Sequence, residues 1–453
     1  MPTSPPPPAG PTIPPRDDFV DMSINDNGVG RGAAHKLPIP TIKRPLQYKT
    51  ALVLAGGGIA GAVYEIGALR AMNDLLVDRT VNDFDIFVGT SAGSLITSML
   101  ANGLTTQEMM QSLNINHPEL RAIRVDDVFQ RNFSETLARL RKLPFTLLRT
   151  GNTFLRNFRE ITLADILWDL ADVLPNGLYD GTALERYVEI ILDRPGCVNR
   201  FDLLEKTLYI VATELDTGER AVFGKGGKGI VPISKAVAAS SAIPILYKPM
   251  SIYGKEYIDG VFRGTASLDL AIEAGAKLVV CINPLAPIDA RHLEKLEHLS
   301  ERGAQTVLSQ VMRILFHSGL KYHIKNLRTK YPDVDIILIE PSSDDYEMFF
   351  QGLMSYSARL TIAEHAFKRV TLGLNENYPY FKTILARHGI QISRRKALNE
   401  LEIMRRGSHD PAILRHIMQE SAVAESLADL LPLSDAMSEL ECSLSQLNLA
   451  ISR

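Results

Sequence analysis

Short apolar runs alternate with helical patterns over most of the chain. The first run is Ala51–Ala55, a continuous apolar stretch that is typical of a strand buried on both faces. Glycines follow it, then a helical pattern through about Leu76. Phe84–Val88 forms a second short apolar strand, and a turn and a helix follow it through about Leu100. Further strands are predicted over residues 208–213, 221–223, 278–282 and 335–339. This alternation predicts an α/β fold with a largely parallel central sheet.

Three segments fall outside the alternating pattern. Residues 1–47 hold 11 of the 25 prolines, which favour extended backbone and prevent core formation, so we expect a disordered tail. Residues 103–180 look helical and lie between two sheet elements, which predicts a helical cap insertion. The pattern is helical again near the end of the chain. We therefore expect one main domain over residues 48–375 and a helical extension over residues 376–453.

The last predicted helix carries a single apolar stripe behind Ser434, a candidate N-cap. The members of the stripe, spaced three and four residues apart, are Met437, Leu440, Leu444, Leu447 and Ile451. Such a stripe packs either on its own domain or on the same helix of a second copy. A homodimer through this helix therefore stays open beside simple packing within one chain.

Composition and charge exclude several functional classes. With 45% hydrophobic and 22% charged residues the chain is ordinary for a folded globular protein, and its net charge of −3 gives no sign of a nucleic-acid partner. Cys197, Cys281 and Cys442 lie far apart, so neither a disulfide scaffold nor a metal site is expected. No apolar run approaches the roughly 18 residues of a membrane-spanning helix, and the N-terminus lacks a signal-peptide pattern. We expect a cytoplasmic protein whose membrane contact, if it has any, is peripheral.

A glycine-rich loop follows the first predicted strand directly. It reads Gly56-Gly57-Gly58-Ile59-Ala60-Gly61, and the next helix begins in it. Glycines let backbone N–H groups approach a ligand, and the helix N-terminus favours negative charge at the same place. The loop is therefore suited to a dinucleotide, a phosphate or a transient oxyanion. The dinucleotide reading needs an acidic residue at the end of the next strand, and this chain has something else there.

The second strand runs into Gly89-Thr90-Ser91-Ala92-Gly93. This is the G-x-S-x-G pattern between a strand and a helix, the context of a nucleophile elbow. The sharp turn exposes the serine hydroxyl, and the N–H of Ala92 can join an oxyanion hole. We therefore predict that Ser91 is a catalytic nucleophile.

A serine nucleophile needs a base, and two kinds of candidate are present. The later histidines lie in helical-looking or charged stretches, where a solvated surface position is the simpler interpretation; they are His292, His298, His317, His323 and His365. The other candidate is Asp259 in Tyr257-Ile258-Asp259-Gly260, where a short strand leads into a glycine turn. By itself this aspartate is equally an ordinary turn residue.

Taken together, the glycine loop, the serine motif and the Asp-Gly pair resemble the patatin-like phospholipases. The block Ala239-Ser240-Ser241-Ala242-Ile243-Pro244 looks like a fourth motif of that family, and the resemblance covers about residues 48–285, extending to 375 at most. It implies a three-layer α/β/α fold and a Ser91–Asp259 dyad without histidine. It also implies oxyanion donors at Gly57, Gly58 and Ala92. The motif glycines are Gly56, Gly61, Gly89, Gly93 and Gly260.

The resemblance further implies a serine lipid acyl hydrolase that acts on phospholipids or other fatty-acid esters without a metal or organic cofactor. Two residues depart from the family pattern. Ala60 stands where many members carry Arg or Lys, which weakens phosphate attraction at the loop. Val261 stands where Gly or Ala is usual, and because a β-branched residue disfavours positive φ, a differently shaped turn after the aspartate is expected.

The predicted cap also contains a basic, apolar segment over residues 130–159. Seven Arg or Lys residues are opposed by Glu135 alone, with four phenylalanines and several leucines between them. Such a segment either lies in an anionic membrane interface or packs its apolar side on the core with its arginines in water. Both interpretations stay open.

Two alternative functions remain beside the patatin-like one. The first is an α/β-hydrolase esterase that depends on one of the later histidines, and histidine substitutions separate it from the dyad enzyme. The second is a catalytically silent lipid-binding protein, which Ala60 and Val261 favour. A fluorophosphonate ester probe separates this one, because a silent protein does not react at Ser91.

Overall fold

The computed structural model describes residues 48–113, 121–130, 176–227, 230–292, 298–406 and 417–418. Its centre is a sheet in the order β10-β9-β1-β2-β4-β8-β7, with β5 paired to the other edge of β4. The strands are β1 (Lys49–Leu54), β2 (Ile86–Thr90), β4 (Thr207–Glu214), β5 (Arg220–Gly224), β7 (Met250–Ile252), β8 (Lys255–Asp259), β9 (Ala276–Ile282) and β10 (Asp335–Ile339). From β10 to β4 every pairing is parallel, which confirms the predicted mixed α/β fold with a mostly parallel sheet.

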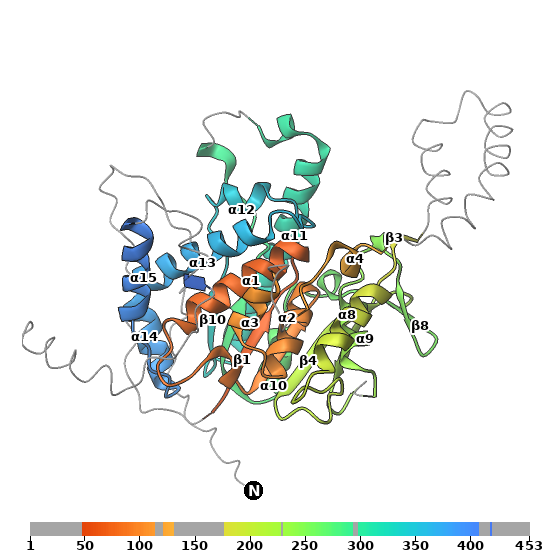
Figure 1. Ribbon diagram of the computed structural model, residues 1–453, viewed down its shortest axis with the longest axis horizontal. Coiled ribbons are helices and arrows are strands. Elements are labelled where there is room, and N and C mark those ends of the chain that lie inside the picture. Colours follow the sequence, from red (N-terminus) through yellow and green to blue (C-terminus); the bar gives the residue numbers. More distant parts are fainter. Residues whose placement is uncertain are drawn as a thin grey trace, which may run out of the picture.

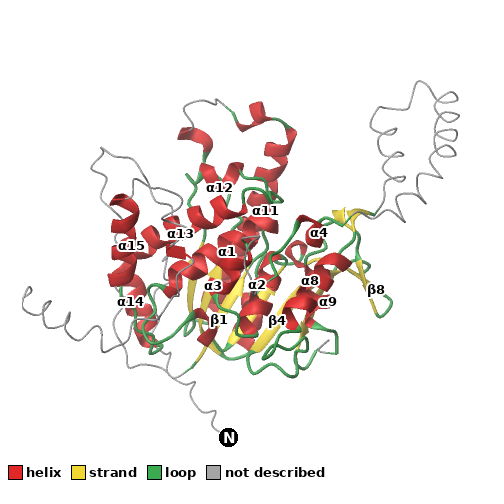
Figure 2. Cartoon of the chain, viewed as in Figure 1, coloured by secondary structure: helices red, strands yellow, loops and turns green. Residues whose placement is uncertain are grey.

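Helices cover both faces of this sheet (Figures 1 and 2). On one face α1 (Gly58–Asn73), α2 (Ala92–Ala101) and α13 (Arg359–Glu376) share a core with Leu52 and Leu54 of β1. On the other face α10 (Leu268–Glu273) and α11 (Ala304–Lys330) meet Ala51 and Val53. Successive residues of β1 therefore point into opposite cores, which is why this strand reads as a continuous apolar run.

Two strands of opposite direction meet on one edge of β4. Parallel β2 pairs with β4 as far as Thr90, which lies opposite Val211. Antiparallel β8 ends at Asp259, opposite Ala212, the next residue along β4. Since β5 occupies the other edge of β4 at Ala212, β2 and β8 must share one edge and abut there. The C-terminal ends of β2 and β8 are thereby brought next to each other.

The predicted cap is helical only in part among the described residues. It contains α3 (Thr106–Ser112) and α4 (Val125–Val128), but its end forms a strand, β3 (Gly177–Tyr179), which pairs with β6 (Ile245–Tyr247) in a separate two-stranded sheet. The helical prediction was wrong there. A Cβ on Gly177 would lie 2.0 Å from the backbone N of Lys248, so the glycine permits this close pairing.

The remaining helices surround the sheet. They are α8 (Thr182–Leu192), α9 (Ile233–Ser240), α12 (Tyr346–Phe350), α14 (Tyr378–Arg387) and α15 (Arg395–Arg406). Ala397 of α15 belongs to the same core as α1, and Lys396 forms an ion pair of 2.8 Å with the buried Asp74. The C-terminal helices therefore pack directly on the sheet domain.

The predicted basic segment lies outside the described residues except for Gln130, and so does the C-terminal apolar stripe. Among the helices that the structure describes, none is long and apolar enough to cross a membrane.

Candidate active site

Ser91 occupies a strained turn between β2 and α2. Its backbone has φ 53° and ψ −122°, a conformation that costs free energy and is found mainly at functional sites. Neighbouring glycines allow the turn to close: a Cβ on Gly93 would lie 2.4 Å from the carbonyl oxygen of Leu54, and one on Gly89 would lie 2.1 Å from Thr97 Oγ1. The predicted elbow is thus present, and its glycines are needed for packing.

The hydroxyl of Ser91 donates a hydrogen bond of 2.5 Å to Oδ2 of Asp259. The other carboxylate oxygen of Asp259, Oδ1, accepts from the backbone N–H of Val261 at 2.9 Å. Both backbone groups of Asp259 are also hydrogen-bonded: its N–H donates to the carbonyl of Ala242, and its carbonyl accepts from Thr213 Oγ1. Both oxygens of the carboxylate therefore have a fixed direction, and one of them is aimed at the serine.

The turn after Asp259 is a short 3₁₀ segment, Gly260–Phe262, in which Val261 does not adopt positive φ. Val261 needs only its backbone N–H to hold the carboxylate, and its buried side chain packs beside Gly56. Gly260, in contrast, cannot carry a side chain without a shift of the backbone, since a Cβ there would lie 2.1 Å from the carbonyl oxygen of Val211. The β-branched residue is therefore compatible with a carboxylate directed at Ser91.

Burial dominates the electrostatics of Asp259. The side chain is fully buried, which raises the pKa of its carboxyl from 3.8 to about 7. The hydrogen bonds from Ser91 and Val261 favour the ionised form and lower this pKa, but they are the smaller effects. A carboxyl group with a pKa near neutrality can take up and release a proton under physiological conditions.

The glycine loop lies directly beside the serine. A Cβ on Gly56 would lie 3.2 Å from Ser91 Cβ, and Gly58 has φ +63°, which glycine adopts without strain. In the described part of the chain the backbone N–H groups of Gly57, Gly58 and Ala92 donate no hydrogen bond. Three N–H groups predicted as oxyanion donors thus come from the two segments that meet at Ser91, and they are free to bind an anion.

Ala60, the departure in the loop, has a packing role. It is fully buried, and its N–H donates to the carbonyl of Leu353 at 3.0 Å. A long cationic side chain would have to fit into this fully buried position. The loop therefore offers N–H groups and the N-terminus of α1 to an anion, without a charged side chain of its own.

Ser240, at the end of α9, links the strands that meet at the site. Its Oγ accepts from the backbone N–H of Ser91 at 2.8 Å and donates to the carbonyl of Val211 at 2.6 Å. The first bond satisfies a buried donor in the strained turn, and the second fixes the direction of the hydroxyl. The Ala239–Pro244 block thus has a physical function in holding the elbow against β4.

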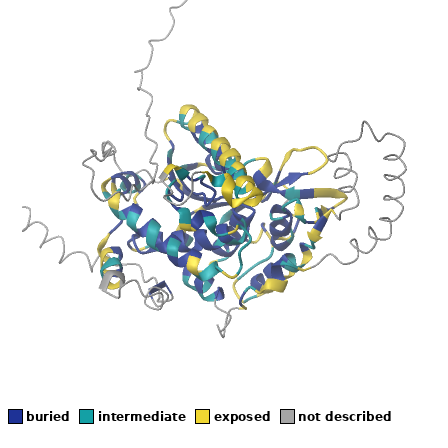
Figure 3. Ribbon diagram, turned by 90° about the horizontal axis from the view of Figure 1, so that it is seen from above, coloured by how far each residue is buried: buried dark blue, intermediate teal, exposed yellow. Residues whose placement is uncertain are grey.

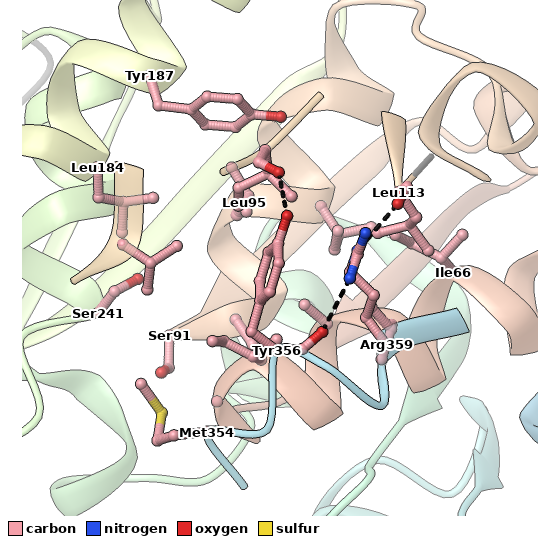
Figure 4. A pocket seen from close by; sticks show the side chains of 18 of the residues that line it. Ile66, Ser91, Leu95, Leu113, Leu184, Tyr187, Ser241, Met354, Tyr356 and Arg359 are labelled. Atoms are coloured by element: carbon pink, nitrogen blue, oxygen red, sulfur yellow. Dashed lines mark hydrogen bonds between the residues drawn. The ribbon is translucent and has the colours of Figure 1, made fainter. Parts of the chain in front are cut away.

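An apolar pocket begins at Ser91 and extends between α1, α2, α3 and α8 (Figure 4). About 850 Å³ of space that protein atoms do not fill lies in it, part of which is open to solvent. Most of its lining is aliphatic or thioether: Ile59, Val63, Ile66, Leu95, Ile96, Met99, Met109, Leu113, Ile123, Val128, Leu184, Ile243 and Met354. A pocket of this composition fits a hydrocarbon chain whose polar end lies at Ser91.

The polar groups in the pocket wall are mostly engaged with the backbone. Tyr356 donates from its hydroxyl to the carbonyl of Ile123 at 2.6 Å, and Arg359 Nε donates to the carbonyl of Leu113 at 2.9 Å (Figure 4). These bonds attach the segment before α13 to the chain after α3. They close one side of the pocket and keep its interior apolar.

A buried cation lies behind the glycine loop. Arg313 of α11 is 1% exposed, and its Nη1 donates to the carbonyl oxygens of Pro284 and Ala286 at 3.3 and 3.1 Å. The Pro284 ring packs on the loop, since a Cβ on Gly57 would come within 2.6 Å of it. Burial lowers the pKa of Arg313 to about 10, so the guanidinium stays charged at neutral pH. Arg313 therefore fixes the turn that supports Gly57 from behind.

None of the candidate histidines hydrogen-bonds to Ser91 in the described structure, but the expectation of solvated surface positions was only partly right. His317 and His365 are partly buried and lie 3.2 and 2.7 Å from Glu340 and Asp345, while His323 lies 3.4 Å from Asp269. Each of these three pairs with a carboxylate that sequence spacing does not place beside it. His298 is exposed, and the side chain of His292 lies outside the described part.

The described residues contain no group of three or more His, Cys, Asp and Glu side chains suited to a metal ion. Sequence reasoning missed the roles of Ser240, Pro284, Arg313 and Arg359. For Ser240, the Ala239–Pro244 motif already indicated in the sequence that this segment matters. For the others no local signal exists, because their partners come from remote parts of the chain.

Known proteins share sequence with this region. Residues 52–272 match the family model for patatin-like phospholipases. The chain is 28% identical over 211 residues to uncharacterized protein R571 of Acanthamoeba polyphaga mimivirus, covering 46% of this chain and 57% of that protein. It is 24% identical over 230 residues to the probable lipid hydrolase 463L of Invertebrate iridescent virus 6, covering 51% of this chain and 65% of that protein. The chain thus spans less than two thirds of the length of either relative.

Two solved structures are also similar to this chain at low identity. One is VipD from Legionella pneumophila, with 15% identity and a TM-score of 0.28, covering 82% of this chain and 79% of that chain. The other is the type III effector protein ExoU, with 14% identity and a TM-score of 0.31, covering 82% of this chain and 62% of that chain.

Proposed function

Through residues 52–272 this chain belongs to the patatin-like phospholipase family, and on that premise we propose that it is a serine lipid acyl hydrolase with a Ser91–Asp259 dyad. The observation that carries the proposal is the 2.5 Å hydrogen bond from Ser91 Oγ to Asp259 beside N–H groups that have no partner in the described chain. The relative named a probable lipid hydrolase is consistent with this class of activity.

The proposed reaction has two steps, acylation of Ser91 and hydrolysis of the acyl-enzyme. Asp259 takes the proton of Ser91, whose oxygen attacks the ester carbonyl, and the N–H groups of Gly57, Gly58 and Ala92 stabilise the oxyanion. Asp259 then gives its proton to the departing alcohol, which leaves an acyl-enzyme. Water attacks this ester in the same way, with Asp259 as base, and releases the fatty acid and the free serine. No step uses a metal or an organic cofactor.

The pocket supports a fatty-acyl ester as the substrate class, because an aliphatic lining gains free energy only by covering hydrocarbon. Phospholipids and lysophospholipids are the proposed esters, with phospholipase A or lysophospholipase activity. We also retain the proposed domain division, with a tail over 1–47, a catalytic domain over 48–375 that includes the cap, and an extension over 376–453. Membrane contact through 130–159 and a homodimer through the C-terminal helix remain proposals of the same kind.

Turnover of a short-chain aryl ester by purified variants tests the dyad. Ser91→Ala and Asp259→Asn should each lose about 10³-fold or more of the activity, and the double variant should be no worse, because the two residues act as one unit. Circular dichroism checks that each variant is folded. Retention of more than a small fraction of turnover by either single variant would contradict the dyad.

Histidine variants and a fluorophosphonate probe test the two alternative functions. Substitution of His292, His298, His317, His323 or His365 by Gln should leave most of the turnover, whereas loss at one of them together with an active Asp259→Asn would establish the histidine-dependent esterase. A wild-type protein that fails to react with a fluorophosphonate probe at Ser91 would establish the silent lipid-binding protein.

A further inference from the structure

The N-terminal half of α11 is an unusual surface for a water-exposed helix. α11 has 27 residues and is therefore about 40 Å long. Its second half packs under the sheet through Leu320, Ile324 and Leu327, while the first half rises beyond α12 (Figure 1) and is largely exposed (Figure 3). The apolar side chains left open there are Val307 (40% exposed), Leu308 (62%), Val311 (44%), Ile314 (45%) and Leu315 (61%). We call these five residues the α11 tip.

The α11 tip carries no exposed charge. From Ala304 to Leu320 the only Lys, Arg, Asp or Glu is Arg313, whose side chain is buried behind the glycine loop. Hence no ionic group would have to leave water if this stretch entered hydrocarbon. The whole of α11 contains no acidic residue, and the exposed pair Glu301 and Arg302 just before it carries no net charge. An apolar helix end without a charge of its own matches the interfacial region of a bilayer.

The tip lies on the same edge of the sheet as the dyad. α11 follows β9, whose C-terminal end at Ile282 lies beside Leu54 at the end of β1. The helix then returns toward the start of β10, so its first half stands at the edge where β1 and β2 end. Ser91 and the glycine loop occupy that edge as well.

Direct contacts couple the tip to the catalytic segments. Phe262, three residues after Asp259 and 43% exposed, packs edge to face on Phe316 of α11 with 5.9 Å between ring centroids. Thr265 Oγ1 donates to the carbonyl of Phe316 at 3.0 Å. Arg313 ties the same helix turn to Pro284 and Ala286. The tip is therefore held in a fixed position relative to Ser91.

From these contacts we propose that the α11 tip inserts into a lipid surface and holds the active site against the membrane, a role that rests on the proposed lipid hydrolase function. A fluid bilayer requires no complementary shape, and the projecting helix end carries no charge of its own that would have to leave water on insertion. The surface is distinct from residues 130–159 and can act with or without them.

The test compares two pairs of substitutions. Leu308→Glu with Leu315→Glu places charge on the tip, and Leu203→Glu with Ile230→Glu changes two residues that are 57% and 87% exposed near the start of β4 and the end of β5, on the opposite edge of the sheet. All four positions are largely exposed, so both variants should fold. Binding is measured by flotation with vesicles of phosphatidylcholine and phosphatidylglycerol in equal parts.

The tip variant should bind these vesicles about tenfold or more weakly than wild type, because each glutamate must leave water to insert. It should hydrolyse vesicle lipid correspondingly more slowly, with unchanged turnover of a soluble short-chain aryl ester. The control variant should match wild type in all three measurements. Fluorophosphonate labelling of Ser91 is unaffected by the tip and separately reports whether the proposed hydrolase chemistry is present.

Equal vesicle binding by the tip variant and wild type would overturn the inference. So would a wild-type protein that does not float with vesicles at all, even if it labels at Ser91. A second copy as the true partner would appear as a wild-type dimer in analytical ultracentrifugation that the tip variant converts to a monomer, with vesicle binding unchanged; this outcome also overturns it.

Discussion

The backbone N–H of Ser91 donates its hydrogen bond to the side chain of Ser240, 149 residues further along the chain. The same hydroxyl donates to Val211, so Ser240→Ala would leave a buried donor and a buried acceptor unsatisfied. We expect this variant to lose about 1–3 kcal/mol of unfolding free energy. We also expect a lower kcat, because the strained turn at Ser91 loses a restraint. Urea unfolding and ester turnover measure the two effects.

Ser98→Ala is the matched control for this substitution. Ser98 is also fully buried, but its hydroxyl donates only to the carbonyl of Leu95 within α2. It should lower stability less and leave kcat near wild type. If Ser240→Ala and Ser98→Ala had equal turnover, Ser240 would be a packing residue without influence on the elbow.

The pH dependence of activity should follow Asp259. Its carboxyl has a pKa of about 7 in the folded protein because it is buried, and only the ionised form can accept the proton of Ser91. We therefore expect kcat/KM to fall as pH decreases through about 7. A profile measured with a neutral aryl ester checks this. A flat profile from about pH 5 to pH 8 would contradict a buried carboxylate base.

The same pKa predicts how stability depends on pH. The pKa of Asp259 is 3.8 in the unfolded protein and about 7 in the folded protein. At pH values between these two, the folded protein therefore binds the proton more tightly than the unfolded protein does. The resulting stabilisation is therefore complete at acid pH and is lost as pH rises through 7, a difference of roughly 4 kcal/mol at most. Asp259→Asn removes this dependence, so the variant should gain stability relative to wild type between about pH 5 and pH 8. Urea unfolding at both pH values measures this gain. If Asp259 were ionised throughout, the difference in unfolding free energy between the variant and wild type would be the same at the two pH values.

Gly260→Ala should prevent the dyad from forming. The new Cβ would lie 2.1 Å from the Val211 carbonyl oxygen and 3.0 Å from Thr90 Cγ2, so β8 could not abut β2. We expect loss of activity together with a lower melting temperature, measured by calorimetry. Gly264→Ala is the control, because the nearest atom to its Cβ would be Ser267 Oγ at 3.8 Å. A folded, active Gly260→Ala protein would disprove the role of this contact.

Arg313→Met should lower both activity and stability. The methionine removes a buried cation whose Nε and Nη2 have no hydrogen-bond partner in the described chain, but it also leaves the buried carbonyls of Pro284 and Ala286 without their donor, which should cost about 1–3 kcal/mol of unfolding free energy. The support behind Gly57 is lost, so we expect kcat to fall about tenfold or more at similar KM, as for loss of oxyanion stabilisation. Arg313→Lys should recover part of this loss. Unchanged kcat in the methionine variant would show that Arg313 only packs.

Local sequence was sufficient for the elements whose structure is set by neighbouring residues. The strand at residues 51–55, the glycine loop and the turn at Ser91 follow from apolar runs and glycines a few positions apart. The relation of Asp259 to Ser91 did not follow from spacing; the family resemblance supplied it. Its physical basis is the register of β8 on β4, which no local pattern encodes.

The interactions that sequence reasoning missed are long-range in the same way. Arg313 reads as one more cation on a long helix, yet it is buried because the turn at Pro284 presents two carbonyl groups to it. His317 and His365 read as surface residues because their carboxylate partners, Glu340 for the first and Asp345 and Glu347 for the second, are remote in the sequence. The strand at Gly177–Tyr179 is too short to show a period.

The meeting of β2 and β8 on a single edge of β4 also bears on how the protein folds. The hydrogen bond between Ser91 and Asp259 joins residues 168 positions apart, and it requires three strands in register. Contacts of such large sequence separation form slowly, because the loop-closure entropy is lost before they form. During refolding, helical circular dichroism should therefore recover before esterase activity. Catalytic competence would report the completion of the sheet, and a kinetic intermediate with β8 undocked would have native-like helices and no function.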